Sequence, residues 1–351
     1  MNRSPQAAFR FFAASDSRFR VALKKYRAGI IGLGRIGFTL GFDKKREKPS
    51  SHSGAFGSNR RISLEGGFDT DPLKRSAWGK YYRKASVYSS LAEMLSDGSW
   101  DILVIAVPEE NHLSVFEKAA PFKPGLIVLE KPVAPEIKDA YKIKRTARKY
   151  GVPVLVNHER RFSRDYILLK KLIFENKLGE PVNIDCSLYT PSRAIKALVR
   201  DGTHLFDAAA YLIGTRPVIR HAEAYGAGLS CMGRTGGVNA FFNIGYRTGH
   251  FTFEIDIIFK NGRARIGNGL FEVSASKESP YYEGFCSLVK VSGYGPFRKT
   301  GYFSGMAANC VDFLDGKAAI GSTLEDGIGS LLTIEEIKTI LKGKAPERHD
   351  S

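Results

Sequence analysis

Lys131 is the residue whose setting in this sequence first suggests chemistry. It follows the apolar run 126–129 and stands between Glu130 and Pro132. A proline restricts the residue before it to an extended backbone, so the lysine side chain has a defined direction. An ammonium group fixed at the end of a strand can hydrogen-bond a reacting oxygen and stabilise its charge. The alternative is an exposed lysine on a loop, and the neighbouring residues favour the catalytic interpretation.

His204 is the second residue suited to proton transfer. An imidazole with an unperturbed pKa near 6.5 can act as a general base at neutral pH. His204 lies at the start of a predicted helix over residues 202–213. Asp207 follows three residues later on the same helical face and could orient the ring. The alternative is a structural histidine whose ring nitrogens make their hydrogen bonds inside a domain interface.

Two charged residues precede this helix. Asp201 has two interpretations, either a helix cap for Thr203 and His204 or a member of a proton relay. Arg200 is suited to binding an anionic group of a substrate. A relay of this kind serves reactions in which an alcohol oxygen loses or gains a proton. Lys131 and His204 could divide that task.

A glycine-rich stretch, Gly32-Leu33-Gly34-Arg35-Ile36-Gly37, has the spacing of a dinucleotide-binding loop. The apolar run 28–31 before it is typical of a buried strand, and residues 38–40 after it can continue a helix. Gly32 allows the tight turn, Gly34 lets the backbone approach a pyrophosphate, and Gly37 lets the helix pack close to the strand. The N–H groups at the helix start would then face the phosphates. The alternative is an ordinary turn, and the flanking strand favours nucleotide binding.

Asp69 follows a predicted strand over residues 62–68 and is the candidate ligand of the adenosine ribose. It lies nearly twice as far from the glycines as the usual 20 or so residues. The polar loop 41–59 explains the extra distance. A carboxylate here would accept hydrogen bonds from the ribose hydroxyls and repel a 2′-phosphate, which favours NAD over NADP. The alternative is a cap for the helix that starts at Pro72, although Asp71 is the better placed cap.

The first half of the chain alternates between strands and helices. Strands are predicted over residues 28–31, 62–68, 101–107, 126–129 and 152–156, with helices between them. This alternation predicts a doubly wound parallel sheet of the α/β class, a Rossmann domain over residues 27–156. Ligands of such sheets bind at the carboxyl ends of the strands. The residues that fall at those ends are Gly32, Asp69, Pro108, Lys131 and Asn157.

The second half, residues 157–345, has a different order of predicted strands and helices. Its predicted helices cover residues 164–176, 202–213, 306–313 and 324–341. Its predicted strands cover residues 181–188, 219–225, 238–246, 251–259 and 263–266, with a further candidate at 286–292. The simplest architecture is an α+β domain in which one mainly antiparallel open sheet carries helices on one face.

Composition excludes several classes of protein. The chain has 351 residues and a net charge of +17, but no dense basic run interleaved with aromatics, so we expect no nucleic-acid partner. No apolar run approaches the roughly 20 residues of a membrane helix. Four separated cysteines indicate neither a zinc site nor a disulfide framework, so we expect no metal and a reducing, cytoplasmic location.

Residues 1–26 form an extension that is rich in arginine and contains one acidic residue. Arg10 interrupts its apolar positions, which argues against a secretory signal peptide. We expect a disordered extension. An organelle transit peptide and a misplaced start codon are the alternatives.

Taken together, these motifs resemble those of the glucose–fructose oxidoreductase / inositol dehydrogenase (Gfo/Idh/MocA) family. The matching segments are the glycine stretch, Phe68-Asp69-Thr70-Asp71-Pro72, Val107-Pro108 with His112, Glu130-Lys131-Pro132, Asn157 with Arg160-Arg161-Phe162, and Gly202-Thr203-His204-Leu205-Phe206-Asp207. Their order and spacing cover residues 28–213. The resemblance implies NAD(P)-linked oxidation or reduction of sugars, polyols or related carbonyl compounds. It also implies a homo-oligomer that associates through the open sheet.

The resemblance assigns further residues to the site. It places Pro108, Asn111, His112, Glu130, Lys131 and Asn157 at the cofactor, and Arg160, Arg161, Arg200 and His204 at the substrate. His112 has the alternative of a buried helix residue. The family often has a relay carboxylate four residues before the histidine, where this chain has Arg200, with Asp201 one residue closer. Either Asp201 or Asp207 could therefore be the partner of His204.

A second class of function remains compatible with these motifs. A non-catalytic dinucleotide sensor of the same fold would keep the glycine stretch without turnover. The presence of both Lys131 and His204 favours the enzyme, whereas Arg200 at the relay position favours the sensor.

Overall fold

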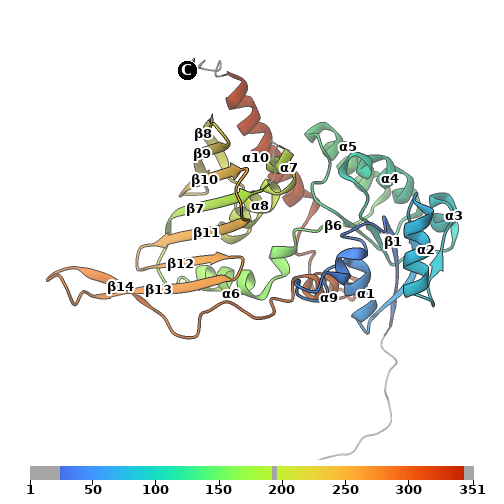
Figure 1. Cartoon of the computed structure of the whole chain (residues 1–351), viewed down its shortest axis with the longest axis horizontal. Coiled ribbons are helices and arrows are strands. Elements are labelled where there is room, and N and C mark those ends of the chain that lie inside the picture. The colour runs from blue at the N-terminus through green and yellow to red at the C-terminus, as the bar shows by residue number, and fades with distance from the viewer. Residues whose placement is uncertain (1–23, 192–195, 344–351) are drawn as a thin grey trace, which may run out of the picture.

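The structure of this protein is a computed structural model that describes residues 24–191 and 196–343 (Figure 1). Residues 1–23 lie outside the described residues, as do the predictions made for them. Two sheets, one parallel and one mainly antiparallel, organise the fold as the sequence predicted. No described helix is long and apolar enough to cross a membrane.

Six parallel strands form the first sheet: β1 (Tyr26–Ile31), β2 (Ile62–Phe68), β3 (Ser86–Val87), β4 (Ile102–Ile105), β5 (Leu126–Leu129) and β6 (Val154–Val156). Their order is β3-β2-β1-β4-β5-β6, which is the doubly wound order of a Rossmann fold. All residues of β4 and β5 are buried. Strands covered on both faces read as continuous apolar runs, which is why the sequence located them well.

Helices cover both faces of this sheet. They are α1 (His52–Ser58), α2 (Pro72–Tyr81), α3 (Leu91–Ser96), α4 (His112–Ala119) and α5 (Ile137–Tyr150). On one face, Ile30 packs in a cluster with Phe56 of α1 and Trp78 of α2. On the other face, Ile31 packs in a cluster with Phe116 of α4 and with residues of α3 and α5.

The first Rossmann helix is interrupted. The carbonyl groups of Ile36 and Gly37 accept hydrogen bonds from the N–H groups of His52 at 3.0 Å and Ser53 at 2.9 Å. In a continuous helix, each carbonyl accepts a hydrogen bond from the N–H group four residues later. Here the donors lie sixteen residues later, so α1 resumes the same helix after an insertion of twelve residues. The helix predicted to run directly through residues 38–40 is thus corrected, because a 3₁₀ turn at Thr39–Phe42 leads the chain outward. This excursion accounts for the long spacing to Asp69.

Eight strands form the second sheet: β7 (Pro181–Thr190), β8 (Val218–Tyr225), β9 (Gly228–Thr235), β10 (Val238–Tyr246), β11 (Thr252–Phe259), β12 (Gly262–Gly267), β13 (Leu270–Glu278) and β14 (Cys286–Lys290). Their order is β14-β13-β12-β11-β7-β10-β9-β8, and only the β7–β10 pair is parallel. The helices α6 (Arg164–Phe174), α8 (Gly202–Ile213) and α10 (Leu324–Gly343) pack on one face, while α7 (Lys196–Arg200) precedes α8.

The other face of this sheet is open and polar. Arg263 of β12 donates to Asp256 of β11 at 2.9 Å through Nε, and Lys290 of β14 donates to Glu272 of β13 at 2.9 Å. Both pairs join residues whose side chains are partly exposed. The prediction of an open, mainly antiparallel sheet is confirmed.

Two strands of this sheet, β9 and β13, were not predicted. Glycines lower the strand propensity of β9, yet the fold requires one of them. A Cβ atom on Gly233 would lie 2.1 Å from the carbonyl oxygen of Val218 on β8. In β13 only Phe271 and Val273 are fully buried, and the polar outer half of the strand hides the alternation.

The chain returns to the parallel sheet near its end. Phe303 and Met306 of α9 (Tyr302–Leu314) belong to the same buried cluster as Ile30 and Phe56 (Figure 1). The helix lies beside α1, so the Rossmann unit is completed by residues from the C-terminal part of the sequence.

Candidate active site

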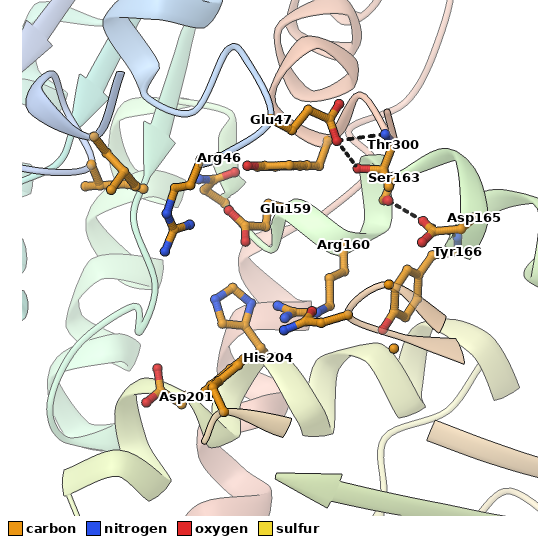
Figure 2. Close-up of a pocket in the computed structure, with 18 of the residues that line it drawn as sticks. Arg46, Glu47, Glu159, Arg160, Ser163, Asp165, Tyr166, Asp201, His204 and Thr300 are labelled. Atoms are coloured by element: carbon orange, nitrogen blue, oxygen red, sulfur yellow. Dashed lines mark hydrogen bonds between the residues drawn. The ribbon is translucent and has the colours of Figure 1, made fainter. Parts of the chain in front are cut away.

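A pocket of about 880 Å³ lies where the two units of the fold meet (Figure 2). Residues that follow three strands of the parallel sheet line it, namely Arg35 after β1, Lys131 after β5 and Asn157 after β6. The second unit contributes His204 from α8 and Asn268 from the turn between β12 and β13. Segments far apart in the sequence thus share one pocket.

The predicted site residues divide into two groups. Nine of them line this pocket: Arg35, Ile36, Glu130, Lys131, Asn157, Arg160, Arg200, Asp201 and His204. The others lie outside its lining: Gly32, Gly34, Gly37, Asp69, Pro108, Asn111, His112, Arg161 and Asp207.

The glycine loop has the shape that a pyrophosphate needs. Gly32 has a φ of +100°, and a Cβ there would lie 2.6 Å from the backbone of Ala106. A Cβ on Gly37 would lie 2.0 Å from the carbonyl oxygen of Gly32. A Cβ on Gly34 would meet nothing within 4 Å, so this position borders open space. In the described part of the chain, the N–H groups of residues 34–36 have no acceptor, which fits a phosphate ligand.

Asp69 holds the glycine loop from the end of β2. Its carboxylate is 8% exposed and accepts from the N–H groups of Leu33 at 2.8 Å and Asp71 at 2.9 Å, one on each oxygen. A carboxylate oxygen has two lone pairs, so each oxygen can still accept from a ribose hydroxyl. The cap of α2 is Asp71, whose side chain accepts from Leu73 N–H at 2.8 Å, as the sequence indicated.

Glu130 is buried at the floor of the pocket and has two donors. Its Oε1 lies 2.7 Å from His52 Nε2 and accepts from Asn157 Nδ2 at 2.6 Å. Burial alone would raise the pKa of Glu130, but the hydrogen bond and charge of His52 and the charge of Lys131 outweigh it and lower that pKa. The ionised carboxylate therefore stands beside Lys131. His52 was not predicted, because its partner lies 78 positions away and no local pattern marks it.

Lys131 lies at the junction of the two units. Its Nζ donates to the carbonyl oxygen of Arg200 at 3.0 Å, which directs the ammonium group across the pocket to the start of α8. The Arg200 side chain is exposed, and its Nε lies 3.7 Å from Glu109 Oε1. This hydrogen bond holds the ammonium group of Lys131 in a defined direction, and the residue lines the pocket.

His204 faces the same pocket from α8, and most of its ring is enclosed. Its Nδ1 is buried and has no hydrogen-bond partner among the described residues. Burial, and after it the positive charges of Lys131 and Arg160, hold the pKa of His204 well below its ordinary value. The imidazole is therefore neutral near pH 7, which is the form that can accept a proton.

Asp201 also lines the pocket, directly before α8. Its side chain makes no capping hydrogen bond, and only its carbonyl oxygen accepts from His204 N–H, at 3.2 Å. Side-chain capping, one of the two interpretations of Asp201, is therefore not observed. The carboxylate makes no ion pair within the described ranges.

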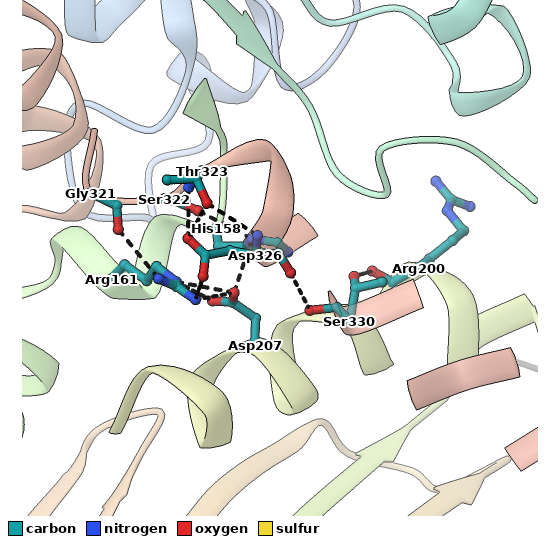
Figure 3. A network of polar contacts seen from close by, with 10 residues as sticks. His158, Arg161, Arg200, Asp207, Gly321, Ser322, Thr323, Asp326 and Ser330 are labelled. Carbon is teal, nitrogen blue, oxygen red and sulfur yellow. Dashed lines mark hydrogen bonds and ion pairs between the residues drawn. The ribbon is translucent and has the colours of Figure 1, made fainter. Parts of the chain in front are cut away.

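Asp207 belongs to a buried ionic network with Arg161 and His158 (Figure 3). Its Oδ1 lies 2.8 Å from Arg161 Nη2 and 3.2 Å from His158 Nδ1, and Arg161 also reaches Asp326 at 3.0 Å. The predicted contact between Asp207 and His204 is thus corrected. Residues three apart on a helix diverge by about 60°, and a guanidinium is the stronger partner of a carboxylate. The same pairing removes Arg161 from the substrate side of the site.

The side chain of His158 connects this network to the pocket. It is buried, and its ring lies 6.1 Å from the ring of His204 in an edge-to-face arrangement. Burial lowers the pKa of His158, and Asp207 opposes that effect. Among the described residues, His158 lies between Asp207 and His204, with Asp207 Oδ1 3.2 Å from its Nδ1.

We expect Asp207→Ala to lower the free energy of unfolding by about 3 kcal/mol, because removing one partner of a buried pair leaves the charge of Arg161 poorly compensated. Urea unfolding followed by circular dichroism would measure the change. Asp256→Ala is the matched control, since it breaks an ion pair on the open sheet, where such pairs contribute about 0–1 kcal/mol. Equal effects of the two substitutions would contradict this assignment.

His112 contacts the backbone next to the site and lies outside the pocket lining. Its Nδ1 lies 2.9 Å from the carbonyl oxygen of Pro132, and its Nε2 lies 3.0 Å from that of Val107. Both ring nitrogens are thus engaged with backbone, which matches the buried alternative rather than contact with nicotinamide. Pro108 and Asn111 are exposed between β4 and α4, outside the pocket lining.

The interrupted helix adds residues that the sequence did not reveal. Arg46 and Glu47 of the excursion line the pocket (Figure 2). The Glu47 carboxylate accepts from the N–H groups of Thr300 at 2.7 Å and Gly301 at 2.6 Å, directly before α9. The length of the polar loop was a signal that this segment had a role, but it could not identify the partner.

These features define a class of protein: a dinucleotide-binding Rossmann unit joined to an α+β unit, with charged side chains lining the pocket between them. Residues 26–158 match the oxidoreductase family with an NAD-binding Rossmann fold, Gfo/Idh/MocA. This match covers the Rossmann unit of the chain and agrees with the resemblance drawn from its motifs.

Several proteins of known sequence or structure are similar to this chain. An uncharacterized oxidoreductase of Schizosaccharomyces pombe is 26% identical over 54% of this chain and 52% of its own length. The scyllo-inositol 2-dehydrogenase (NADP(+)) of Bacillus subtilis is 27% identical over 41% of this chain and 40% of its own. The chain spans about half the length of the curated relatives it matches. A Bordetella pertussis dehydrogenase, solved with NADH and UDP-GlcNAcA, shares the fold with a TM-score of 0.73 at 20% identity, over 91% of this chain and 96% of its own.

Proposed function

We propose that this protein is an NAD-dependent oxidoreductase that transfers a hydride between nicotinamide and a sugar-like, polyol or related carbonyl substrate. The observation that carries the proposal is the convergence of Lys131 and His204 on one pocket that Arg35 and Ile36 of the glycine loop also line. The activity named for the Bacillus subtilis relative supports the polyol class.

The residues divide the work on the substrate oxygen. A bound nicotinamide supplies the hydride acceptor or donor. Lys131 donates a hydrogen bond to the substrate oxygen and stabilises the negative charge that develops there. His204, neutral because of its depressed pKa, accepts the hydroxyl proton during oxidation and returns it during reduction. Asp201 lies one turn before His204 at the same pocket and remains, of the two carboxylates considered as partners of His204, the one available to the relay.

A screen of purified protein would test this function directly. Absorbance of NADH would be followed with a panel of polyols, aldoses, sugar acids and their keto forms, in both directions. Turnover of at least one member that requires the protein supports the proposal. NADH binding without turnover of any member would favour the dinucleotide sensor instead.

We further propose that NAD is preferred over NADP, because Asp69 places a negative charge beside the expected 2′ position. Calorimetric titration should show that NADH binds at least about tenfold more tightly than NADPH, a difference of 1.4 kcal/mol. Tighter binding of NADPH would overturn this preference. It would then assign the 2′-phosphate to Lys74, whose Nζ lies 3.8 Å from Asp69 Oδ1, and to Arg75.

A further inference from the structure

We infer that the substrate of this site carries a negatively charged substituent, a carboxylate or a phosphate, which Arg160 binds beside the reacting carbon. The inference rests on the proposed function and narrows its substrate class from neutral sugars and polyols to acidic ones. It is carried by the way Arg160 is held and by the absence of a protein counter-ion for it in the described part of the chain.

Packing fixes the guanidinium of Arg160. Its central carbon lies 3.6 Å from the ring centroid of Phe253 on β11, and the ring itself is 1% exposed. Stacking covers one flat face of the guanidinium and leaves its N–H edges for hydrogen bonds in the plane. Those edges match the geometry of a carboxylate or a phosphate, which guanidinium groups bind in a bidentate manner. Arg160 is half-buried and lines the pocket.

No carboxylate of the described residues forms an ion pair with Arg160. The neighbouring Arg161 differs, since it pairs with both Asp207 and Asp326. A half-buried cation without a counter-ion is unfavourable, so its retention in a pocket indicates that a ligand supplies the charge.

Three of the acids that line the pocket are engaged elsewhere. Glu47 accepts from the backbone before α9, and Glu130 accepts from Asn157. Asp165 accepts from the hydroxyl of Ser163 and from the N–H of Tyr166 at 2.9 Å (Figure 2). The bonds of these carboxylates are with neutral donors or histidine, and Arg160 remains available to an incoming anion.

The position of Arg160 would place the charged substituent close to the hydroxyl that reacts. Figure 2 shows its guanidinium beside the ring of His204, on the same wall of the pocket. The positive charge of Arg160 is also one of the causes that lower the pKa of His204. An anion on Arg160 would therefore hold the substrate with a nearby hydroxyl facing His204 and Lys131. Glu159 and Asp201, which also line the pocket, are suited to bind other hydroxyl groups.

The test compares matched ligands on protein saturated with NADH. Calorimetry would measure the binding of glucose, glucuronate and glucose 6-phosphate, and of glucitol, gluconate and glucitol 6-phosphate. At least one acid should bind ten times more tightly than its neutral counterpart, and the better acid identifies the substituent. Arg160→Gln should weaken that acid at least tenfold and change the neutral ligand less than twofold. Arg160→Lys, which keeps the charge without the bidentate edge, should fall between.

The control is Arg164→Gln, because Arg164 also stacks on a phenylalanine, 5.0 Å from the ring centroid of Phe297, but lies outside the pocket lining. It should leave the affinity for the acid unchanged. Equal affinity for acids and neutral ligands in the parent protein, or an unchanged affinity in Arg160→Gln, would overturn the inference. Turnover separates the two proposals. Acid binding without any redox activity would refute the oxidoreductase and support the anion site. Turnover with no preference for acids would support the oxidoreductase and overturn the anion site.

Discussion

Lys131→Met should lower turnover about 10²- to 10⁴-fold while NADH still binds, because a positioned group that acts on the transferred proton contributes on that scale. Methionine keeps much of the side-chain bulk and removes the charge and the donors. In the structure, Lys131 Nζ donates to the carbonyl oxygen of Arg200, which holds the ammonium group between the parallel sheet and α8. The loss should therefore appear in the chemical step and not in cofactor affinity.

Steady-state rates and the fluorescence of bound NADH would separate these two effects. Gly34→Val is the opposite control: its side chain would enter space that the free protein leaves open, so the variant should fold and fail to bind NADH. Lys118→Met, on the exposed side of α4, should change neither quantity. A Lys131→Met enzyme with turnover within a few-fold of the parent would refute the catalytic assignment and reopen the sensor interpretation.

Elements with a local signature were predictable from the sequence. The parallel strands β4 and β5 are continuous apolar runs because helices cover both faces of their sheet. The glycine loop and the Asp71 cap of α2 depend on residues within a few positions of one another. The place of Lys131 at the site also followed from sequence, because ligands of a doubly wound sheet bind at the carboxyl ends of its strands.

Contacts between distant residues were not predictable from these local patterns. The excursion in the first Rossmann helix could be inferred only as a long loop, since its closure depends on hydrogen bonds from His52 and Ser53 to carbonyls sixteen positions earlier. Spacing allowed Asp207 to face His204, but Arg161, 46 positions away, takes the carboxylate. Helical periodicity gives the face on which a residue lies and does not give the stronger partner from another element.

The two arginines after β6 illustrate the same limit at the site. Arg160 and Arg161 are adjacent and identical in type, so the sequence assigned both to the substrate. The two arginines differ only in the side chains that pack against them in the folded protein. Phe253 holds Arg160 at the pocket, while Asp207 and Asp326 neutralise Arg161 behind it.

His204→Ala should lower the rate of alcohol oxidation about 10²- to 10⁴-fold and remove the acid limb of its pH profile. The base form of His204 is the neutral imidazole, so oxidation is lost as the pH falls through the pKa of that group. Because burial and the charges of Lys131 and Arg160 lower this pKa, the limb in the parent should lie below the ordinary value of about 6.5. Profiles of kcat/KM from pH 4.5 to 9 would locate it, within the range where the parent stays folded.

Two further variants make this assignment specific. Lys131→Met removes the positive charge that lowers the pKa of His204 most, so the residual activity should show the limb at a higher pH than in the parent. His221→Ala alters an exposed histidine on β8 and should leave the profile unchanged. A limb that survives in His204→Ala, or a parent limb above pH 6.5, would assign the proton transfer to another group. Asp201, which lines the same pocket one turn earlier, would be the next residue to test.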